Sequence, residues 1–176
     1  MTSTINLEFG ARISASGMLL NDQMDYFARE LGAPNAFGLP GGAANLPRPG
    51  RRPVSSMSPT IVLAGEAVEL CVGASGGSRI PTATEQVALL ALEMDVPIGE
   101  AIARPRMHHQ GMPAALRHEA GVDVSALLAA WRRGHDLEPI ATVANVQAIR
   151  IVRREDGTIE LHAASDPRKD GEPRGR

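Results

Sequence analysis

Two adjacent glycines, Gly76 and Gly77, lie where an apolar run over residues 67–72 has ended and a helical pattern begins near Ser78. Glycine has no Cβ, so the backbone N–H groups of such a turn can be approached closely. N–H groups beside a helix N-terminus can stabilise a bound anion, or negative charge developing on a reacting carbonyl oxygen. The same residues also suit a plain strand-to-helix connection. Their spacing matches neither the Walker loop nor the dinucleotide fingerprint.

Two adjacent serines, Ser55 and Ser56, precede a second apolar run. Serine adds little to a packed core, so a pair at this place needs another reason. Two neighbouring hydroxyls can donate hydrogen bonds to one carboxylate. The sequence therefore indicates either a carboxylate site or a serine-rich turn that leads into a strand.

Two adjacent histidines, His108 and His109, are the third group that could do chemistry. On an extended strand their side chains point to opposite faces, so they converge poorly on one ion. No cysteine or third histidine stands at ligand spacing, and the lone Cys71 fits a small hydrophobe in an apolar strand. The sequence therefore predicts no metal site and no cofactor.

The elements that must position these groups follow from short periodic runs. The predicted strands are 2–9, 60–63, 67–72, 143–152 and 158–163, and the predicted helices are 82–93, 98–103 and 124–133. A long Gly- and Pro-rich loop at 32–52 either covers a site or wraps the surface. Strands and helices come in separate runs, which predicts an α+β or layered α/β/β/α domain rather than a doubly wound sheet. We expect one domain over 1–176, with a frayed tail at 166–176.

Composition argues against two kinds of partner. The net charge is −2 and the arginines are scattered singly or in pairs, so no nucleic-acid surface is expected. No apolar run approaches the roughly 20 residues of a membrane helix, so no membrane span is expected. Hydrophobic residues make up 43% of the chain but aromatics only 3%, so the core must rest on aliphatic side chains.

Six segments, in order along the chain, resemble the small, C-terminal subunit of the γ-glutamyltranspeptidase family. They are Thr4-Ile-Asn6, the segment 17–27, Arg52-Pro-Val-Ser-Ser-Met, Gly73 to Ile80, the segment 104–119 with its Pro-Arg-Met-His-His-Gln, and Ala164-Ser-Asp-Pro-Arg. The resemblance implies a four-layered α/β/β/α fold of the N-terminal nucleophile hydrolase type. It also implies γ-glutamyl transfer from glutathione or other γ-glutamyl compounds to an amino acid, a peptide or water. The expected partner is the large subunit of the same precursor, and the expected location of the full-length protein is periplasmic or extracellular.

Catalytic roles carry over to three positions. Thr4 matches the threonine that orients the nucleophile, while Gly76 and Gly77 match the backbone donors of the oxyanion hole. The nucleophile itself, the N-terminal threonine of the processed small subunit, belongs to a strand that this sequence lacks. The fold is therefore expected to be incomplete at its N-terminus, and the chain alone is expected to be inactive. An inactive truncated remnant is the non-enzymatic alternative.

Substrate-binding roles carry over to six further positions. Asn6 and Gln23 match groups that contact the substrate α-amino group, and the Ser55–Ser56 pair matches the clamp for its α-carboxylate. Tyr26 stands where the family has an aspartate that pairs with the substrate ammonium. A tyrosine carries no charge at neutral pH, so the full protein is predicted either to favour acyl groups without an amine, as glutaryl or cephalosporin acylases do, or to use Asp25 instead.

Overall fold

The structure, a computed structural model, describes residues 4–5, 10–35 and 38–175 of the 176-residue chain. Backbone contacts divide the chain into a first unit, Met1–Ser55, and a second unit, Ser56–Arg176. The boundary falls between the two serines of the predicted carboxylate clamp. The expectation of one domain over 1–176 stays a prediction.

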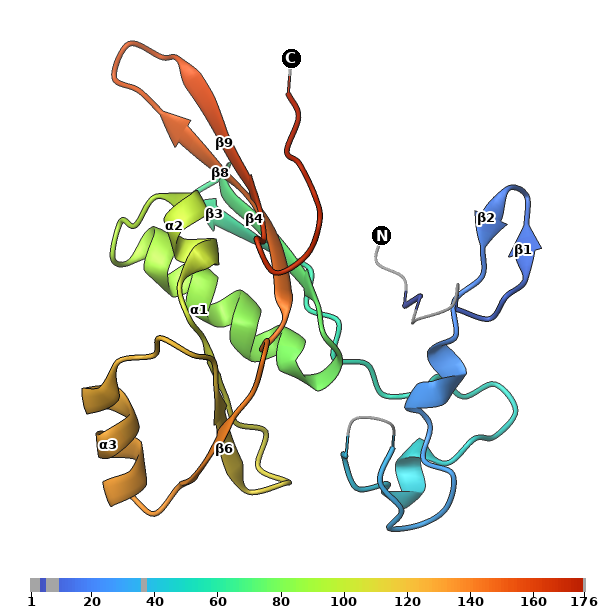
Figure 1. Ribbon diagram of the computed structural model, residues 1–176. Helices are drawn as coiled ribbons and strands as arrows, with labels where there is room; N and C mark the ends of the chain where they lie inside the picture. The colour runs from blue at the N-terminus through green and yellow to red at the C-terminus, as the bar shows by residue number, and fades with distance from the viewer. Residues whose placement is uncertain (1–3, 6–9, 36–37, 176) are drawn as a thin grey trace. The chain divides into compact units, whose positions relative to one another are not determined.

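The second unit is built on a four-stranded antiparallel sheet of order β3-β4-β8-β9. The strands are β3 Thr60–Ala64, β4 Ala67–Ser75, β8 Asn145–Arg153 and β9 Ile159–Ser165. Figure 1 shows two helices against this sheet, α1 Ile80–Leu92 and α2 Ile98–Ala103. Pro97 directly precedes α2, where its fixed φ of −52° suits a helix start.

The core lies between the helices and one face of this sheet. Leu70 and Val72 alternate along β4 and point to this face, as the period of two in a strand requires. They meet Val87 of α1 and Val146 of β8, and all four side chains are at most 5% exposed. Burying an aliphatic side chain of this size contributes roughly 1.5–3 kcal/mol.

The opposite face of the sheet carries a row of apolar residues. Ile61, Cys71, Ile149 and Ala163 are cross-strand partners and therefore share this face. Ile61 is 65% exposed and Ile149 is 42% exposed. The same face borders a cavity of about 700 Å³, which the C-terminal residues 172–174 also line.

A second, three-stranded sheet of order β5-β6-β7 joins the last helix to the unit. Its strands are β5 Met107–His108, β6 Ala115–His118 and β7 Asp136–Pro139, and α3 Val124–Arg132 connects the parallel pair β6 and β7. Asp123 caps α3, because its Oδ1 accepts from the Ser125 N–H at 2.7 Å. None of these strands was predicted, because runs of two to four residues carry little periodicity.

The first unit contains little regular structure in its described part. Its elements are β1 Ser14–Ala15, β2 Met18–Leu19, the 3-10 helix η1 Gln23–Tyr26 and the 3-10 helix η2 Ala43–Asn45. Asn45 ties the predicted 32–52 loop down: its Nδ2 donates to the Tyr26 carbonyl, and its Oδ1 accepts from the Val54 N–H. Gly41 packs so closely that a Cβ there would lie 2.3 Å from the Ala28 Cβ.

Most predicted elements of the second unit are confirmed within a few residues. The α+β class is confirmed, and Ile98–Ala103 is helical over its predicted length. The predicted strand over Thr2–Phe9 lies largely outside the described residues. The predicted start of the frayed tail at Asp166 is too early, because Asp166 is 1% exposed and bonded to β8.

One leucine pair tests where the core lies. Leu70→Ala in the 176-residue chain should lower the free energy of unfolding by about 2–5 kcal/mol, because Leu70 is fully buried against α1. Leu161→Ala on β9, where Leu161 is 67% exposed, should change it by less than about 0.5 kcal/mol. Urea titration followed by circular dichroism measures both, and equal losses would contradict this assignment of the core.

Candidate active site

The predicted glycine turn stands at the end of β4, directly before the 3-10 helix η3 Gly77–Arg79 and α1. Gly76 has φ 146° and Gly77 has φ 62°, a region that side-chain-bearing residues rarely adopt. A Cβ on Gly76 would lie 2.9 Å from the Ala144 Cβ and 3.0 Å from its Cα. Gly76 is thus required both by its dihedral angle and by the closeness of the next backbone segment.

Both glycine carbonyls are held inside the second unit. The Gly76 carbonyl accepts from the N–H and the Nε of Arg79, whose Nη1 donates to the Thr142 carbonyl at 3.0 Å. The Gly77 carbonyl accepts from the Ser56 Oγ at 2.8 Å. In a planar trans peptide the N–H points opposite to the C=O, so the Gly77 N–H points away from Arg79. Such an N–H beside a helix start can stabilise an oxyanion.

The two serines of the predicted carboxylate clamp belong to different units, and one of them contacts the glycine turn. Ser56 is brought to the glycine turn, and its hydroxyl hydrogen is used on the Gly77 carbonyl. Its Oγ keeps the capacity to accept a hydrogen bond. Ser55 is exposed and belongs to the first unit. The structure therefore gives Ser56 a contact with the glycine turn that its sequence context did not predict.

The remaining predicted residues lie in the first unit. Gln23, Asp25 and Tyr26 are all on η1, whose Asp22 N–H donates to the Thr4 carbonyl at 3.2 Å. The Gln23 Nε2 is buried and meets no acceptor within the described ranges. Tyr26 is 4% exposed, so its ring belongs to the interior of this unit.

Asn6 lies outside the described residues, so its role stays a prediction. Asp25 is exposed and lines a cavity of about 430 Å³ together with Arg29 and Asn35. An exposed carboxylate beside a cavity fits a group that meets a ligand from solvent. The roles carried over to Asp25, Gln23, Tyr26 and Thr4 stay predictions.

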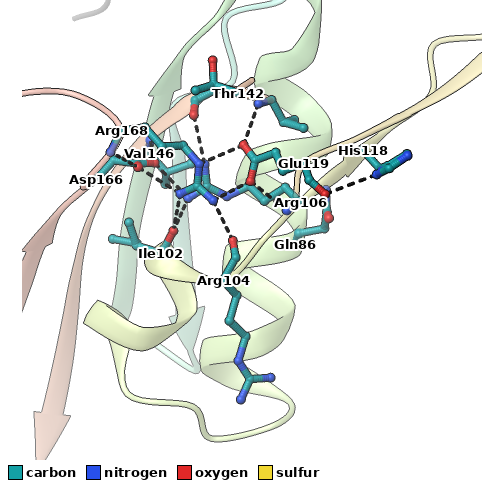
Figure 2. A network of polar contacts seen from close by, with 12 residues as sticks. Gln86, Ile102, Arg104, Arg106, His118, Glu119, Thr142, Val146, Asp166 and Arg168 are labelled. Atoms are coloured by element: carbon teal, nitrogen blue, oxygen red, sulfur yellow. Dashed lines mark hydrogen bonds and ion pairs between the residues drawn. The ribbon is translucent and has the colours of Figure 1, made fainter. Parts of the chain in front are cut away.

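A buried network of charged groups, shown in Figure 2, was not predicted. Arg106 and Asp166 have side chains 2% and 0% exposed, and the Arg106 Nη2 lies 2.8 Å from the Asp166 Oδ2. Arg168 bonds both carboxylates, with its Nη1 3.0 Å from the Asp166 Oδ1 and its Nη2 2.5 Å from the Glu119 Oε2. Buried charges are stable only when paired and hydrogen-bonded, and these four satisfy one another.

The network also fixes the backbone that faces the glycine turn. Glu119 accepts from the Val143 N–H at 2.7 Å, and Asp166 accepts from the Val146 N–H at 2.8 Å. Arg106 donates to the Ala144 carbonyl at 3.0 Å. Since Ala144 is the residue against which Gly76 packs, the charged groups hold one wall of the turn.

The two buried carboxylates have lowered pKa values. Burial alone would raise the pKa of Asp166, but the hydrogen bonds from the Val146 N–H and from both arginines lower it by more. Burial would likewise raise the pKa of Glu119, and the bonds from Arg168 and from the Val143 N–H overcome that effect. Both groups are therefore ionised at neutral pH.

Across residues 4–5, 10–35 and 38–175, no three His, Cys, Asp or Glu side chains group as a metal would require. His108 is 2% exposed on β5, and burial lowers its pKa. His109 instead lies edge-on to the His135 ring, with centroids 5.2 Å apart.

Comparison with known proteins identifies the family. A family profile described as Gamma-glutamyltranspeptidase matches residues 1–175. The chain belongs to the gamma-glutamyltranspeptidase family. It is 41% identical over 170 residues to the glutathione hydrolase proenzyme of Escherichia coli K12, covering 96% of this chain, and 39% identical to that of Pseudomonas aeruginosa, covering 97%.

A solved structure of a gamma-glutamyltranspeptidase agrees with this assignment. The T380A mutant of the Helicobacter pylori protein superimposes with a TM-score of 0.86 at 38% identity, covering 96% of this chain and 92% of that chain. The chain spans only 29% and 31% of the lengths of the Escherichia coli and Pseudomonas aeruginosa proteins. In those glutathione hydrolase proenzymes, the matching region is therefore one part of a longer chain. No helix in the described ranges is both long and apolar enough to cross a membrane.

The buried carboxylates predict how stability depends on pH. Their folded pKa values lie below the unfolded ones, so their stabilisation is present above about pH 4–4.5 and is lost as pH falls through the folded values. Asp166→Asn should cost about 3–5 kcal/mol at pH 7, because Arg106 loses its buried partner. It should also make the fall below pH 4 less steep, as measured by urea unfolding from pH 7 to 3.

The matched control is Asp170→Asn, since Asp170 is exposed. It should keep the wild-type stability within about 0.5 kcal/mol and keep the wild-type pH profile. An Asp166→Asn protein as stable as the Asp170→Asn protein would show that the network does not hold the fold.

Proposed function

We propose that the protein to which this chain belongs transfers or hydrolyses the γ-glutamyl group of glutathione and other γ-glutamyl amides. Family membership and the relatives named glutathione hydrolase support this activity. The observation that carries it is the Gly76–Gly77 turn, which stands at a helix start with both carbonyls engaged inside the protein. Because the N–H lies opposite the C=O in each peptide, the bonds on the Gly76 carbonyl direct the Gly77 N–H away from Arg79, where an acyl oxygen can bind it.

The proposed mechanism is acyl transfer through a covalent intermediate. The hydroxyl of an N-terminal threonine, from residues outside this sequence, adds to the γ-carbonyl carbon and gives its proton to the threonine α-amine. The carbonyl oxygen becomes an oxyanion that the N–H groups of Gly76 and Gly77 stabilise. When the C–N bond breaks, the leaving amine takes the proton and an ester remains. Water or the amine of an amino acid or peptide then attacks the ester carbonyl and loses a proton to the α-amine. The C–Oγ bond breaks and the threonine oxygen takes that proton back, giving hydrolysis or transfer.

The other carried-over residues receive binding and orienting roles. Thr4 orients the nucleophile, while Asn6, Gln23 and Asp25 bind the substrate α-amino group. The Ser55–Ser56 pair binds the α-carboxylate, and Ser56 does so by turning its hydroxyl hydrogen from the Gly77 carbonyl to the carboxylate. Ser56 therefore links substrate recognition to the glycine turn, because its one hydroxyl hydrogen is shared between the Gly77 carbonyl and the carboxylate.

The partner is the large subunit of the same precursor, which would complete a four-layered α/β/β/α sandwich. The support is the partly exposed apolar row of Ile61, Cys71, Ile149 and Ala163 on the face of the sheet away from α1, which borders a cavity. Packed sheets lie about 10 Å apart with interdigitating apolar side chains, which is what this row offers. By the same reasoning the 176-residue chain alone is inactive. The full-length protein is proposed to act in the periplasm or outside the cell.

A second activity, removal of glutaryl-type acyl groups, rests on Tyr26. This residue replaces the family aspartate and is 4% exposed, so its effect is to remove a charge rather than to offer a new ligand. A substrate ammonium would then lose a charge-assisted bond worth roughly 1.5–3 kcal/mol, unless Asp25 supplies it. An inactive remnant is the third possibility, and the intact glycine turn and serine pair argue against it.

The oxyanion role is tested with two glycines that share one backbone conformation. Gly77 and Gly65 both have φ 62°, so this dihedral angle disfavours alanine at both positions. In the complete protein, Gly77→Ala should lower kcat for γ-glutamyl-p-nitroanilide by about 10²–10³-fold, because it moves an oxyanion donor. Gly65→Ala, in the open β3–β4 turn, should leave kcat unchanged. Equal effects of the two substitutions would sink the oxyanion role.

The acyl preference is tested with a pair of amides. If Tyr26 sets specificity, the complete protein should turn over a glutaryl anilide about 10–100-fold better, in kcat/KM, than the γ-glutamyl anilide. Tyr26→Asp should reverse the ratio, with circular dichroism confirming the fold. Equal or better turnover of the γ-glutamyl amide by the wild-type protein would exclude a preference for glutaryl-type acyl groups.

A further inference from the structure

A chain of hydrogen bonds connects the glycine turn to a buried histidine. The Ser78 Oγ donates to the Gln110 Oε1 at 2.6 Å, and the same oxygen lies 2.9 Å from the His108 Nε2. The other ring nitrogen, Nδ1, lies 2.7 Å from the Thr82 Oγ1. The chain thus runs from η3 through the segment after β5 to the first turn of α1. None of these side chains has a role in the proposed acyl transfer.

The direction of each bond follows from one amide. The Gln110 Nε2 donates to the Met112 carbonyl at 2.8 Å, so the amide nitrogen must face that carbonyl. Its oxygen therefore faces Ser78 and His108, and an amide oxygen only accepts. The His108 Nε2 must then carry a hydrogen. The Thr82 hydroxyl has one hydrogen and two acceptors in reach, the His108 Nδ1 at 2.7 Å and the Arg79 carbonyl at 3.1 Å, and with a neutral ring it donates to Nδ1. Burial lowers the pKa of His108, which favours the same neutral ring.

The rest of the ring's surroundings fix its position. Gln86 of α1 bonds the backbone of Met107 twice, with its Nε2 2.8 Å from the carbonyl and its Oε1 3.0 Å from the N–H. This pair holds β5 against α1, and His108 is 2% exposed beside it. The position of the His108 ring is therefore fixed. The Gln110 side chain bonds both this ring and the Ser78 hydroxyl, so it holds Ser78 in place.

We propose that Ser78, Gln110 and a neutral, Nε2-protonated His108 form a positioning relay that holds the Gly76–Gly77 turn in its donor geometry. The turn needs such a restraint, because glycine adopts many backbone conformations at similar energy. Oxyanion donors work only when their orientation is fixed beforehand. The Gly77–Ser78 peptide is held on one side by Ser56 on its carbonyl and on the other by Gln110 on the Ser78 hydroxyl.

The expected effect of the relay on catalysis rests on the proposed function. The hydrogen bonds of the relay do not. The three residues position the turn and do not touch substrate in this scheme. Loss of the relay should therefore lower kcat and leave KM nearly unchanged, since ground-state binding is kept. It should also let the two glycines sample other conformations, whether or not a substrate is turned over.

The kinetic test compares variants at Ser78 in the complete protein. Ser78→Ala should lower kcat by about 10- to 100-fold with KM unchanged, because a small misplacement of a catalytic group has effects of this size. Ser78→Thr keeps the hydroxyl and should recover most of kcat. Ser125→Ala, an exposed position at the start of α3, is the matched control and should match the wild type. A wild-type kcat in Ser78→Ala would overturn the relay.

The spectroscopic test is independent of activity. The chain has only 5 histidines and 18 glycines, so ¹⁵N labelling of each type gives a readable spectrum. His108 should show the Nε2–H tautomer at neutral pH, and Ser78→Ala should add exchange broadening at the Gly76 and Gly77 amides. The other tautomer, a charged ring, or unbroadened glycines in Ser78→Ala would overturn the relay. A wild-type protein without γ-glutamyl turnover would instead overturn the proposed function, and the spectra would still decide the relay.

Discussion

Arg106 and Asp166 meet in the interior of the second unit, where their side chains are 2% and 0% exposed. At such a place an unpaired charge would be costly, so Arg168 and Glu119 must complete the set. Each carboxylate also accepts a backbone N–H, from Val143 for Glu119 and from Val146 for Asp166. The path of the chain from Val143 to Val146 is therefore fixed by charge pairing and not only by apolar packing.

The position of the glycine turn depends on the backbone around Val143 to Val146. Gly76 packs against Ala144, and Arg79 reaches from the turn to the Thr142 carbonyl. Residues about 65 positions apart in sequence thus define one local geometry. The buried charges hold the backbone segment against which Gly76 packs, and Arg79 and Ser56 hold the carbonyls of the turn itself.

This arrangement explains how a site made of main-chain groups is controlled. In the proposed site the donors are backbone N–H groups, which every residue type except proline carries. The rest of the fold must therefore fix their orientation. The second unit supplies it with a strand end, a helix start, a serine on the Gly77 carbonyl and the network beneath Ala144. The family's solved structures share this fold, with a TM-score of 0.86 for the Helicobacter pylori protein. In the proposed reaction the contribution of the second unit is therefore a backbone of fixed shape at Gly76 and Gly77.

The family, the α+β class and the main helices and strands were determined by the sequence alone, because they depend on local periodicity and on ordered motifs. The glycine turn was also found from sequence, since adjacent glycines between a strand and a helix are a local signal. The three-stranded sheet, the Arg106–Asp166 pairing and the Ser56 contact with Gly77 were decided only by the tertiary structure. Arg106 and Asp166 stood in recognised motifs, but nothing local shows that charged residues 60 positions apart are buried together. Pairing across that distance is set by how the sheet and helices pack, which no short stretch of sequence encodes.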